Sequence, residues 1–327
     1  MKKNVIALAI ASAIAAPVAM ADAPTVYGQV NMALEQVDVK DNDAASGTEV
    51  NSRASRVGVK GSEDLGNGLK AIYKFEFEVQ IDEGSTLKNR NQYVGLAGGF
   101  GTVLMGRHDT PTKMIQAKDL FNDASLADNK PMAGGLGAFG KGMENRVSNV
   151  LAYVSPEFSG VKLIAAAVPS EGTTTGDESS LSDLYSVALT YGSTKKGLYL
   201  AAGMDQASEE YAADANHMRL VAQYKTGGLV ANAMYQDFGG DAIEDTVQGG
   251  SNVQANLGYK MGNIMPKVKF SSVDRDAGED SSNYAVGLNY SFGKKTTGYV
   301  EYASIENAGG VDEANTSAVS VGLLHKF

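Results

Sequence analysis

The stretch LKAIYKFEFEVQI, residues 69–81, alternates apolar and polar side chains along almost its whole length. One face is continuously apolar, and the opposite face carries Lys70, Lys74, Glu76 and Glu78. A period of two residues predicts a β-strand, because successive strand side chains point to opposite faces. The stretch is about twice as long as the usual globular strand of about 5–6 residues. Such a strand is typical of a barrel with lipid outside and water inside.

The same alternation recurs along the chain, for example in residues 217–225 and 283–292. Counting every such segment predicts sixteen antiparallel strands, and an even number is what a single-chain bacterial barrel requires. We therefore expect an all-β fold, a 16-stranded antiparallel transmembrane β-barrel. The predicted strands span residues 25–39, 53–62, 69–81, 90–97, 102–107, 146–155, 161–168, 184–191, 198–204, 217–225, 229–236, 252–260, 267–273, 283–292, 297–304 and 317–327.

The connections between these strands alternate between short and long. Short ones such as residues 64–68 and 226–228 carry turn residues, whereas residues 108–145 form much the longest connection. Short turns at one end and long loops at the other are the outer-membrane pattern. More than half of the 38 acidic residues fall in the long loops other than the third, while lysines gather at the short turns. We expect no cofactor, but the acidic rim could hold divalent cations loosely, shared with lipopolysaccharide.

The N-terminus has the features of a secretory signal peptide. Lys2 and Lys3 precede an apolar run over residues 5–16, and Ala19-Met20-Ala21 fits a cleavage site. We therefore expect residues 1–21 to be removed and residues 22–327 to form the barrel. No later stretch reaches the roughly 20 continuous apolar residues of a spanning helix.

Composition excludes several classes of protein. The chain has no cysteine, which excludes a disulfide framework and thiol catalysis, and its 38 acidic against 28 basic residues argue against nucleic-acid binding. Only three histidines occur, and neither G-x-S-x-G nor H-E-x-x-H is present. We therefore expect no enzymatic activity and no metal centre.

Seven short segments, taken in order, carry a family resemblance: Val26–Gln29, Ser55–Gly61, Gly66–Leu69, Arg90–Leu96, Gly101–Arg107, Arg146–Tyr153 and the C-terminal Leu324–Phe327. Together they resemble the Gram-negative trimeric general porins over the whole mature chain. The resemblance is nearer to the neisserial and gammaproteobacterial members with short loops. It implies a homotrimer in the outer membrane, in contact with lipid and lipopolysaccharide, and recognition of Phe327 by the barrel-assembly machinery.

The resemblance also implies a constriction. In that family the third loop, here residues 107–145, folds into the barrel and narrows it. Matching positions place a basic wall at Arg56, Arg90 and Arg146. The acidic partners are expected among Asp109, Asp119, Asp123, Asp128 and Glu144, and the mid-loop residues Asp119, Asp123 and Asp128 are favoured. The loop lacks the Pro-Glu-Phe-Gly-Gly motif of enterobacterial members.

Alternation itself supports an inward direction for Arg56, which shares its face with Lys60 and opposes Val57 and Val59. The same counting from Arg90 and Arg146 gives a less usual result. It directs three apolar residues into the lumen, where we expect the folded-in loop to cover them, and it turns Asn149 outward to a subunit contact. The three residues are Val94, Leu96 and Val150.

The function that follows is passive diffusion of small hydrophilic solutes and ions through a water-filled barrel narrowed by the third loop. The alternative is a substrate-specific outer-membrane channel of the same fold. A specific channel needs a stacked aromatic path or a dedicated ligand cluster in the lumen. Most tyrosines instead fall on the apolar rows, where they suit the interfacial girdles, since the chain has no tryptophan.

Overall fold

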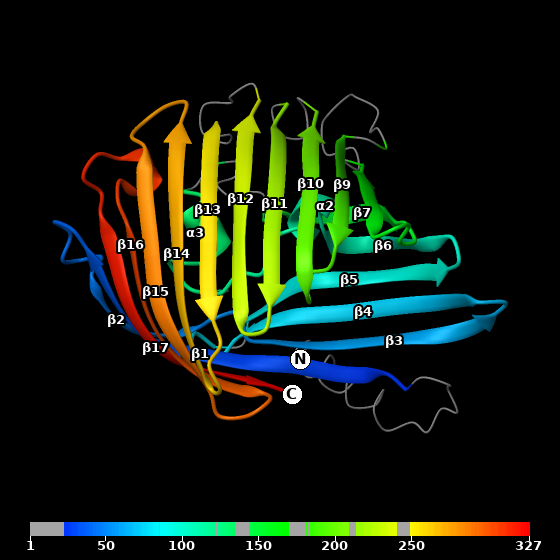
Figure 1. Ribbon diagram of the computed structural model, residues 1–327, viewed down its shortest axis with the longest axis horizontal. Helices are drawn as coiled ribbons and strands as arrows, with labels where there is room; N and C mark the ends of the chain where they lie inside the picture. The colour runs from blue at the N-terminus through cyan, green and yellow to red at the C-terminus, as the bar shows by residue number, and fades with distance from the viewer. Residues whose placement is uncertain are drawn as a thin grey trace.

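The computed structural model describes residues 23–327 except 85, 122, 135, 137–143, 170–180, 182, 209–213 and 241–248. The predicted signal peptide lies outside these residues. The described chain is almost entirely β-structure (Figure 1). Among the described residues, no helix is long and apolar enough to cross a membrane.

The strands form one closed antiparallel sheet, because the last strand pairs with the first from Gln29 opposite Lys326 to Val39 opposite Thr316. Phe327 and Gly28 exchange backbone hydrogen bonds at this seam. The strands are β1 (Thr25–Val39), β2 (Gly47–Ser52), β3 (Arg56–Gly66), β4 (Leu69–Gln80), β5 (Thr86–Gly98), β6 (Gly101–Asp109), β7 (Arg146–Val154), β8 (Val161–Val168), β9 (Leu184–Gly192), β10 (Gly197–Ala207), β11 (Asn216–Thr226), β12 (Leu229–Gly239), β13 (Gly250–Tyr259), β14 (Ile264–Arg275), β15 (Ser281–Ser291), β16 (Thr296–Ile305) and β17 (Thr316–Lys326).

The 17 segments make sixteen barrel strands, since β2 and β3 both pair with β1 and together occupy one position in the sheet. The predicted strand at 53–62 therefore differs from the observed one, which begins at Gly47, is interrupted between Ser52 and Arg56, and ends at Gly66. Ser52 lies opposite Met32 and Arg56 opposite Gln29, so the second strand has one more residue here than β1. The extra residue breaks the ladder, and Ala54 takes a left-handed φ of 48°. This break turns Arg53 toward the lumen, as shown below.

A bulge in β5 corrects the expected direction of Val94 and Leu96. Phe75 pairs with Gln92 and Phe77 with Asn89, so two residues of β5 oppose the single residue Glu76. The bulge reverses the face on which later residues of the strand lie. Val94 and Leu96 are 56% and 44% exposed on the outer surface, and the prediction that they face inward was wrong.

A second bulge lies in β7, where Gly106 pairs with Val150 and His108 with Val147. Asn149 takes a φ of 60° within it and is exposed, while Val150 is buried. The inward direction of Val150 is therefore confirmed. Val150 packs in an apolar cluster with residues of β6, β8 and β9. The subunit contact of Asn149 stays a prediction.

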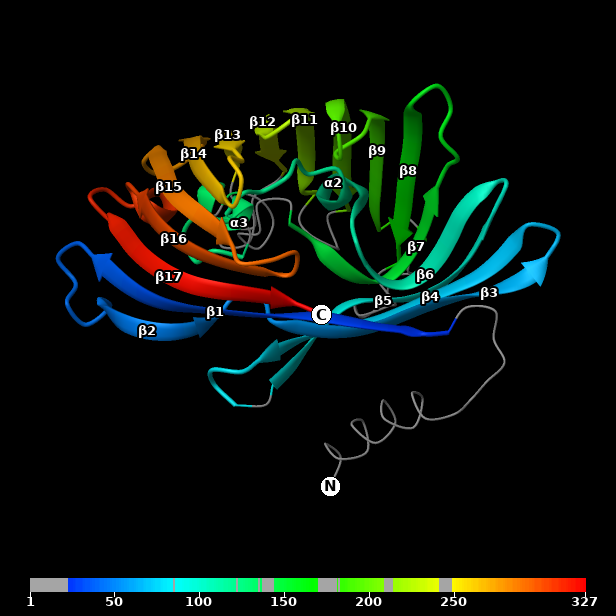
Figure 2. The same cartoon turned by 60° about the horizontal axis from the view of Figure 1, so that its bottom comes forward.

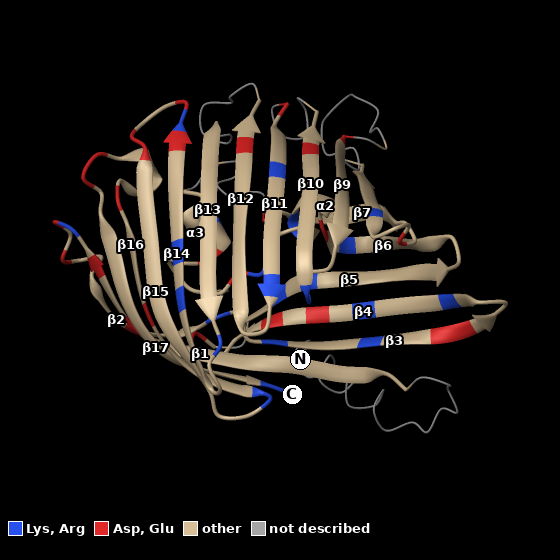
Figure 3. Cartoon of the chain, in the orientation of Figure 1, with Lys and Arg blue, Asp and Glu red and all other residues tan. Residues whose placement is uncertain are grey.

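The two ends of the barrel differ in charge. Figure 3 shows acidic residues at the loop ends of β10, β12 and β14 and basic residues at the turn end of β11. The third loop, residues 110–145, connects β6 to β7, so it begins three residues later than expected. The described part of this loop contains two short helices, α2 (Pro111–Met114) and α3 (Asn129–Met132), which lie inside the barrel beneath β9 to β14 (Figure 2).

Candidate functional site

The third loop is attached to one half of the inner wall by side chains that donate hydrogen bonds to its backbone. These donors come from six neighbouring strands, β10 to β15, and all but one of the carbonyl groups that they reach accept no backbone hydrogen bond within the described part of the loop; the exception is that of Asn129. The pairs are Tyr199 to Ile115, Arg219 to Thr112, Asn232 to Lys118, Gln254 to Asn129, Lys267 to Leu120, Lys269 to Ala127, Arg275 to Gly134, and Ser271, Asn252 and Asn283 to Met132.

Apolar contacts hold the same loop against the same wall. Ile115 packs with Ala188 and Tyr199, and Phe121 packs in a second cluster with Ala285 and other small residues of the wall. Ile115 and Phe121 are almost completely buried. Each such side chain contributes about 1.5–3 kcal/mol on burial. The loop therefore fills one side of the barrel, and the passage runs between the loop and the opposite wall.

That opposite wall carries the predicted arginines, and their first partners are carboxylates of the wall itself. Arg90 Nε lies 2.8 Å from Glu76 Oε1, and its Nη1 lies 2.7 Å from Glu78 Oε2. Glu76 also accepts a hydrogen bond of 2.7 Å from the Tyr27 hydroxyl and lies 3.2 Å from Lys74 Nζ. Arg90 is thus held in a network of alternating charge on β1, β4 and β5.

Arg146 is held at the loop end of the same wall. Its Nε lies 2.9 Å from Asp109 Oδ1 and donates a 2.8 Å hydrogen bond to Asn91. Lys113, from the start of the third loop, lies 3.4 Å from the same carboxylate oxygen. Asp109 therefore joins the root of the loop to the basic wall.

Arg56 is the predicted wall arginine that meets a predicted loop carboxylate. Its Nη1 lies 3.8 Å from Asp123 Oδ2. Asp123 takes a φ of 64°, a left-handed conformation that Asp adopts more readily than most residues, and this projects the turn at the tip of the loop. The contact brings the loop and the basic wall together across the lumen.

Asp119 and Asp128 lie elsewhere than the resemblance implied. Asp119 is buried, pairs with Lys269 at 3.0 Å and accepts hydrogen bonds from the backbone amides of Phe121 and Asn129. Asp128 accepts from the amides of Asp123 and Lys130 and caps α3. Both carboxylates therefore organise the loop itself, because its unpaired amides need acceptors. The structure gives neither of them a contact with the arginine wall.

Several charged residues of the lumen were not predicted from the sequence. Arg53 is buried and bridges Glu35 and Glu301, and Lys267 lies 2.5 Å from Glu301. Alternation could have indicated Lys267 and Lys269, since both continue the inner row of β14. Alternation gives the wrong face for Arg53, because the break between β2 and β3 shifts its position.

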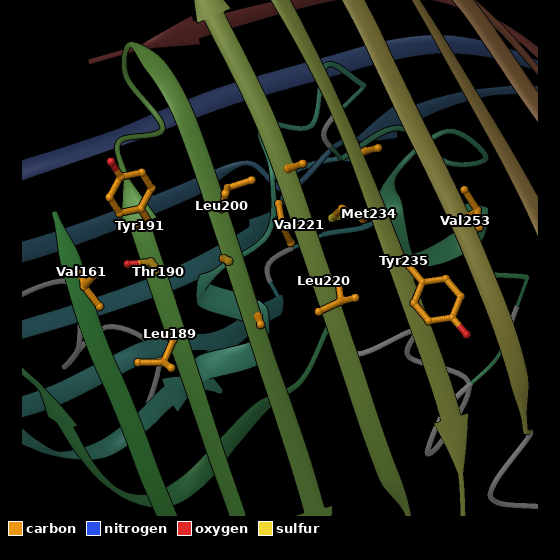
Figure 4. Close-up of a pocket in the computed structure, with 14 residues that line it drawn as sticks. Val161, Leu189, Thr190, Tyr191, Leu200, Leu220, Val221, Met234, Tyr235 and Val253 are labelled. Carbon is orange, nitrogen blue, oxygen red and sulfur yellow. The ribbon is translucent and has the colours of Figure 1, made fainter.

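A hollow of about 360 Å³ lies inside the barrel, and Arg56, Asp119 and Asp123 are among the residues that line it. A larger hollow of about 600 Å³ lies on the outer surface over β8 to β13 (Figure 4). Its walls are outward apolar side chains such as Leu200 and Leu220, so it belongs to the lipid-facing surface. No group of three or more metal-ligating side chains occurs among the residues that the structure describes.

Comparison with known proteins agrees with this geometry. The profile of the Gram-negative porins matches residues 7–310. The chain belongs to the Gram-negative porins. The major outer membrane protein P.IB of Neisseria meningitidis serogroup B is 30% identical to this porin, over 100% of both chains, and the P.IB of Neisseria gonorrhoeae is 28% identical over 100% of both. The predicted outer-membrane location and the passive diffusion function are thereby confirmed.

Solved structures confirm the fold. The anion-selective porin from Comamonas acidovorans superposes with a TM-score of 0.80 at 23% identity, covering 94% of this porin and 100% of that chain. OmpF of Salmonella typhi, in complex with daunomycin, superposes with a TM-score of 0.73 at 14% identity, covering 93% and 97%. The predicted 16-stranded antiparallel barrel is therefore correct.

Proposed function

We propose that Arg56, Arg90 and Arg146 form the basic side of the narrowest part of this diffusion pore, with Asp123 as their acidic partner on the third loop. The contact of 3.8 Å between Arg56 and Asp123 carries the proposal, because it joins wall and loop across the passage. Charges of opposite sign on the two sides set a transverse field, in which polar solutes align and from which apolar solutes gain little.

We also propose that the pore prefers anions weakly. Screening confines the influence of the acidic loop rim to about 8 Å at physiological salt, so charges at the waist decide selectivity. The ion pairs at the waist contain five basic side chains but only four carboxylates. One positive charge therefore remains in excess and attracts a passing anion. The pairs join Arg56, Arg90, Arg146, Lys74 and Lys113 to Asp123, Glu76, Glu78 and Asp109.

A further part of the proposal concerns assembly. OmpT of Vibrio cholerae, which shares the fold, has been solved in a trimer form, and we propose a homotrimer for this porin. Phe327 directly follows β17, the strand that closes the barrel, which suits a signal read by the barrel-assembly machinery. The acidic loops suit contact with lipopolysaccharide through divalent cations.

The test of the constriction is the reversal potential of the pore in a potassium chloride gradient across a planar bilayer. Replacing Arg56, Arg90 and Arg146 together by glutamine should move that potential toward the value for cations. The corresponding triple lysine variant keeps the charge and should keep most of the anion preference. A glutamine variant with the potential of the unmodified pore would remove these arginines from the constriction.

A further inference from the structure

The hollow inside the barrel lies below the third loop, on the side of the short turns. From the loop it is lined by Lys118, Asp119, Leu120 and Asp123, and from the wall by residues that include the turn-side ends of β11, β13 and β17. Short turns face the periplasm in outer-membrane barrels. A solute that has passed the contact between Arg56 and Asp123 therefore enters this hollow before it leaves the pore.

Besides Lys267 of β14, four lysines line the hollow, each from a different segment. Three of them stand where an inner row of the barrel ends, because Lys225 follows Gln223 in β11, Lys260 follows Gly258 and Asn256 of β13, and Lys326 follows Leu324 in β17. The fourth, Lys118, comes from the third loop. These residues, Lys118, Lys225, Lys260 and Lys326, are called the lysine ring below.

The lysine ring differs from the other cations of the hollow in having no acidic partner. Arg53 pairs with Glu35 and Glu301, Arg56 lies against Asp123, and Lys267 pairs with Glu301. Within the described part of the chain, no carboxylate lies within 4.0 Å of an ammonium group of the lysine ring. The carboxylates of the hollow are therefore already used, and four positive charges remain.

Lys118 shares the hollow with Lys225 and Lys326 and is close enough to both to be repelled by them. Burial together with the positive charges of Lys326 and Lys225 lowers the pKa of the Lys118 ammonium. Like charges gathered in a partly enclosed space raise the local concentration of counter-ions. An anion with several charges relieves this repulsion at several lysines at once, which a chloride ion cannot do. Flexible ammonium groups suit phosphate oxygens as point charges.

We propose that the lysine ring is a binding site for multivalent phosphate anions on the periplasmic side of the constriction. The site rests on the proposed function only in that solutes reach it through the pore. Such a site makes the block of the pore by phosphate differ between its two sides. A multivalent phosphate arriving from the turn side meets the lysine ring directly, whereas one arriving from the loop side must first pass the acidic rim and the waist.

Pyrophosphate tests the site through its block of single-channel potassium chloride conductance. Added in turn to the two sides of one inserted channel, it should block at a several-fold lower concentration from one side. Replacing Lys118 and Lys326 by glutamine should raise the lower half-blocking concentration about tenfold, which corresponds to about 1.4 kcal/mol. A second variant, with Lys225 and Lys260 replaced by glutamine, should act in the same direction.

The matched control replaces Lys195 and Lys196 by glutamine. These lysines lie in the β9–β10 turn and are absent from the lining of the hollow, yet the change in net charge is the same. The control should keep the asymmetric block. Equal block from both sides, or an unchanged asymmetry in both lysine-ring variants, would overturn the site. A pore that conducts and responds to the triple arginine variant, but shows no asymmetric block, contradicts only the lysine ring.

Discussion

The two halves of the inner wall are built from different side chains. The half formed by β10 to β15 is covered by the third loop, and its inner rows are rich in amides, hydroxyls and small apolar residues that meet the loop. The half formed by β1 and β3 to β7 lines the passage and carries arginines paired with carboxylates. One face of a barrel strand can therefore serve either as a support or as a channel wall.

The difference shows which side chains indicate a wall that supports the loop and which indicate a wall that lines the channel. A covered wall must satisfy the carbonyl groups of an irregular loop, so it needs neutral donors at many positions. A wet wall has water as its partner, so it tolerates charge and gains a field from it. The two lysines of β14 on the covered half each have a carboxylate partner and donate to the loop: Lys269 pairs with Asp119 of the loop, and Lys267 pairs with Glu301 of the wall and donates to the carbonyl of Leu120.

The largest effect is expected from removing a charge under the loop. Replacing Lys269 by alanine leaves Asp119 as a buried carboxylate without its cation and frees the carbonyl of Ala127. Breaking a buried pair in this way costs about 3–5 kcal/mol. We expect residues 115–134 to leave the wall, with faster hydrogen exchange in that segment and larger, noisier single-channel conductance.

The double variant with Asp119 replaced by asparagine and Lys269 by methionine is the control. It removes both charges together and should recover most of the protection of the loop, because no lone charge remains buried. If the loop amides of the alanine variant exchanged hydrogen at the rate of the unmodified protein, the buried ion pair would not hold the loop, and the distinction between a dry and a wet wall would be wrong.

Sequence patterns gave the barrel with few errors, since the period of two residues reflects a constraint that acts on every strand. The errors fall where one extra residue enters a strand. Val94 and Leu96 lie beyond the bulge in β5, and Arg53 lies in the break between β2 and β3. Alternation carries no signal for a bulge, because the bulge is set by local backbone geometry and by the partner strand.

The contacts between the third loop and the arginine wall were predictable only in part. Arg56 lies in a regular strand, so counting from its neighbours gave its direction. The loop carboxylates have no such period. Asp119 and Asp123 are four residues apart, yet one is buried against Lys269 and the other reaches Arg56. Their roles depend on which loop amides lack acceptors, and this is decided only once the loop is folded against the wall.

The pH dependence of loop docking shows whether the covered side of the wall excludes water. Burial and the nearby Asp119 raise the pKa of Asp128 to about 7, whereas the pKa of an Asp in an unfolded chain is about 3.9. Between these values the docked loop holds a proton that the undocked chain has released, so rising pH weakens docking. Below the window and above it, Asp128 contributes no further change.

Hydrogen-exchange protection factors of residues 115–134 should therefore fall from pH 5 to pH 8. Replacing Asp128 by asparagine should flatten this dependence, since asparagine still caps α3 and cannot ionise. Protection that falls equally in the asparagine variant would assign the pH dependence to another group.

The smallest effect is expected from a single neutral donor on the covered wall. Asn232 donates a 2.9 Å hydrogen bond to the carbonyl of Lys118 and accepts one of 3.2 Å from Asn256. Replacing Asn232 by alanine should weaken docking of the loop by about 1 kcal/mol, the usual net worth of a neutral hydrogen bond. The many other donors keep the loop in place, so conductance and reversal potential should stay unchanged while exchange near Lys118 rises about fivefold. A loss comparable to that of the Lys269 variant would mean that single donors, and not the buried ion pair, hold the loop.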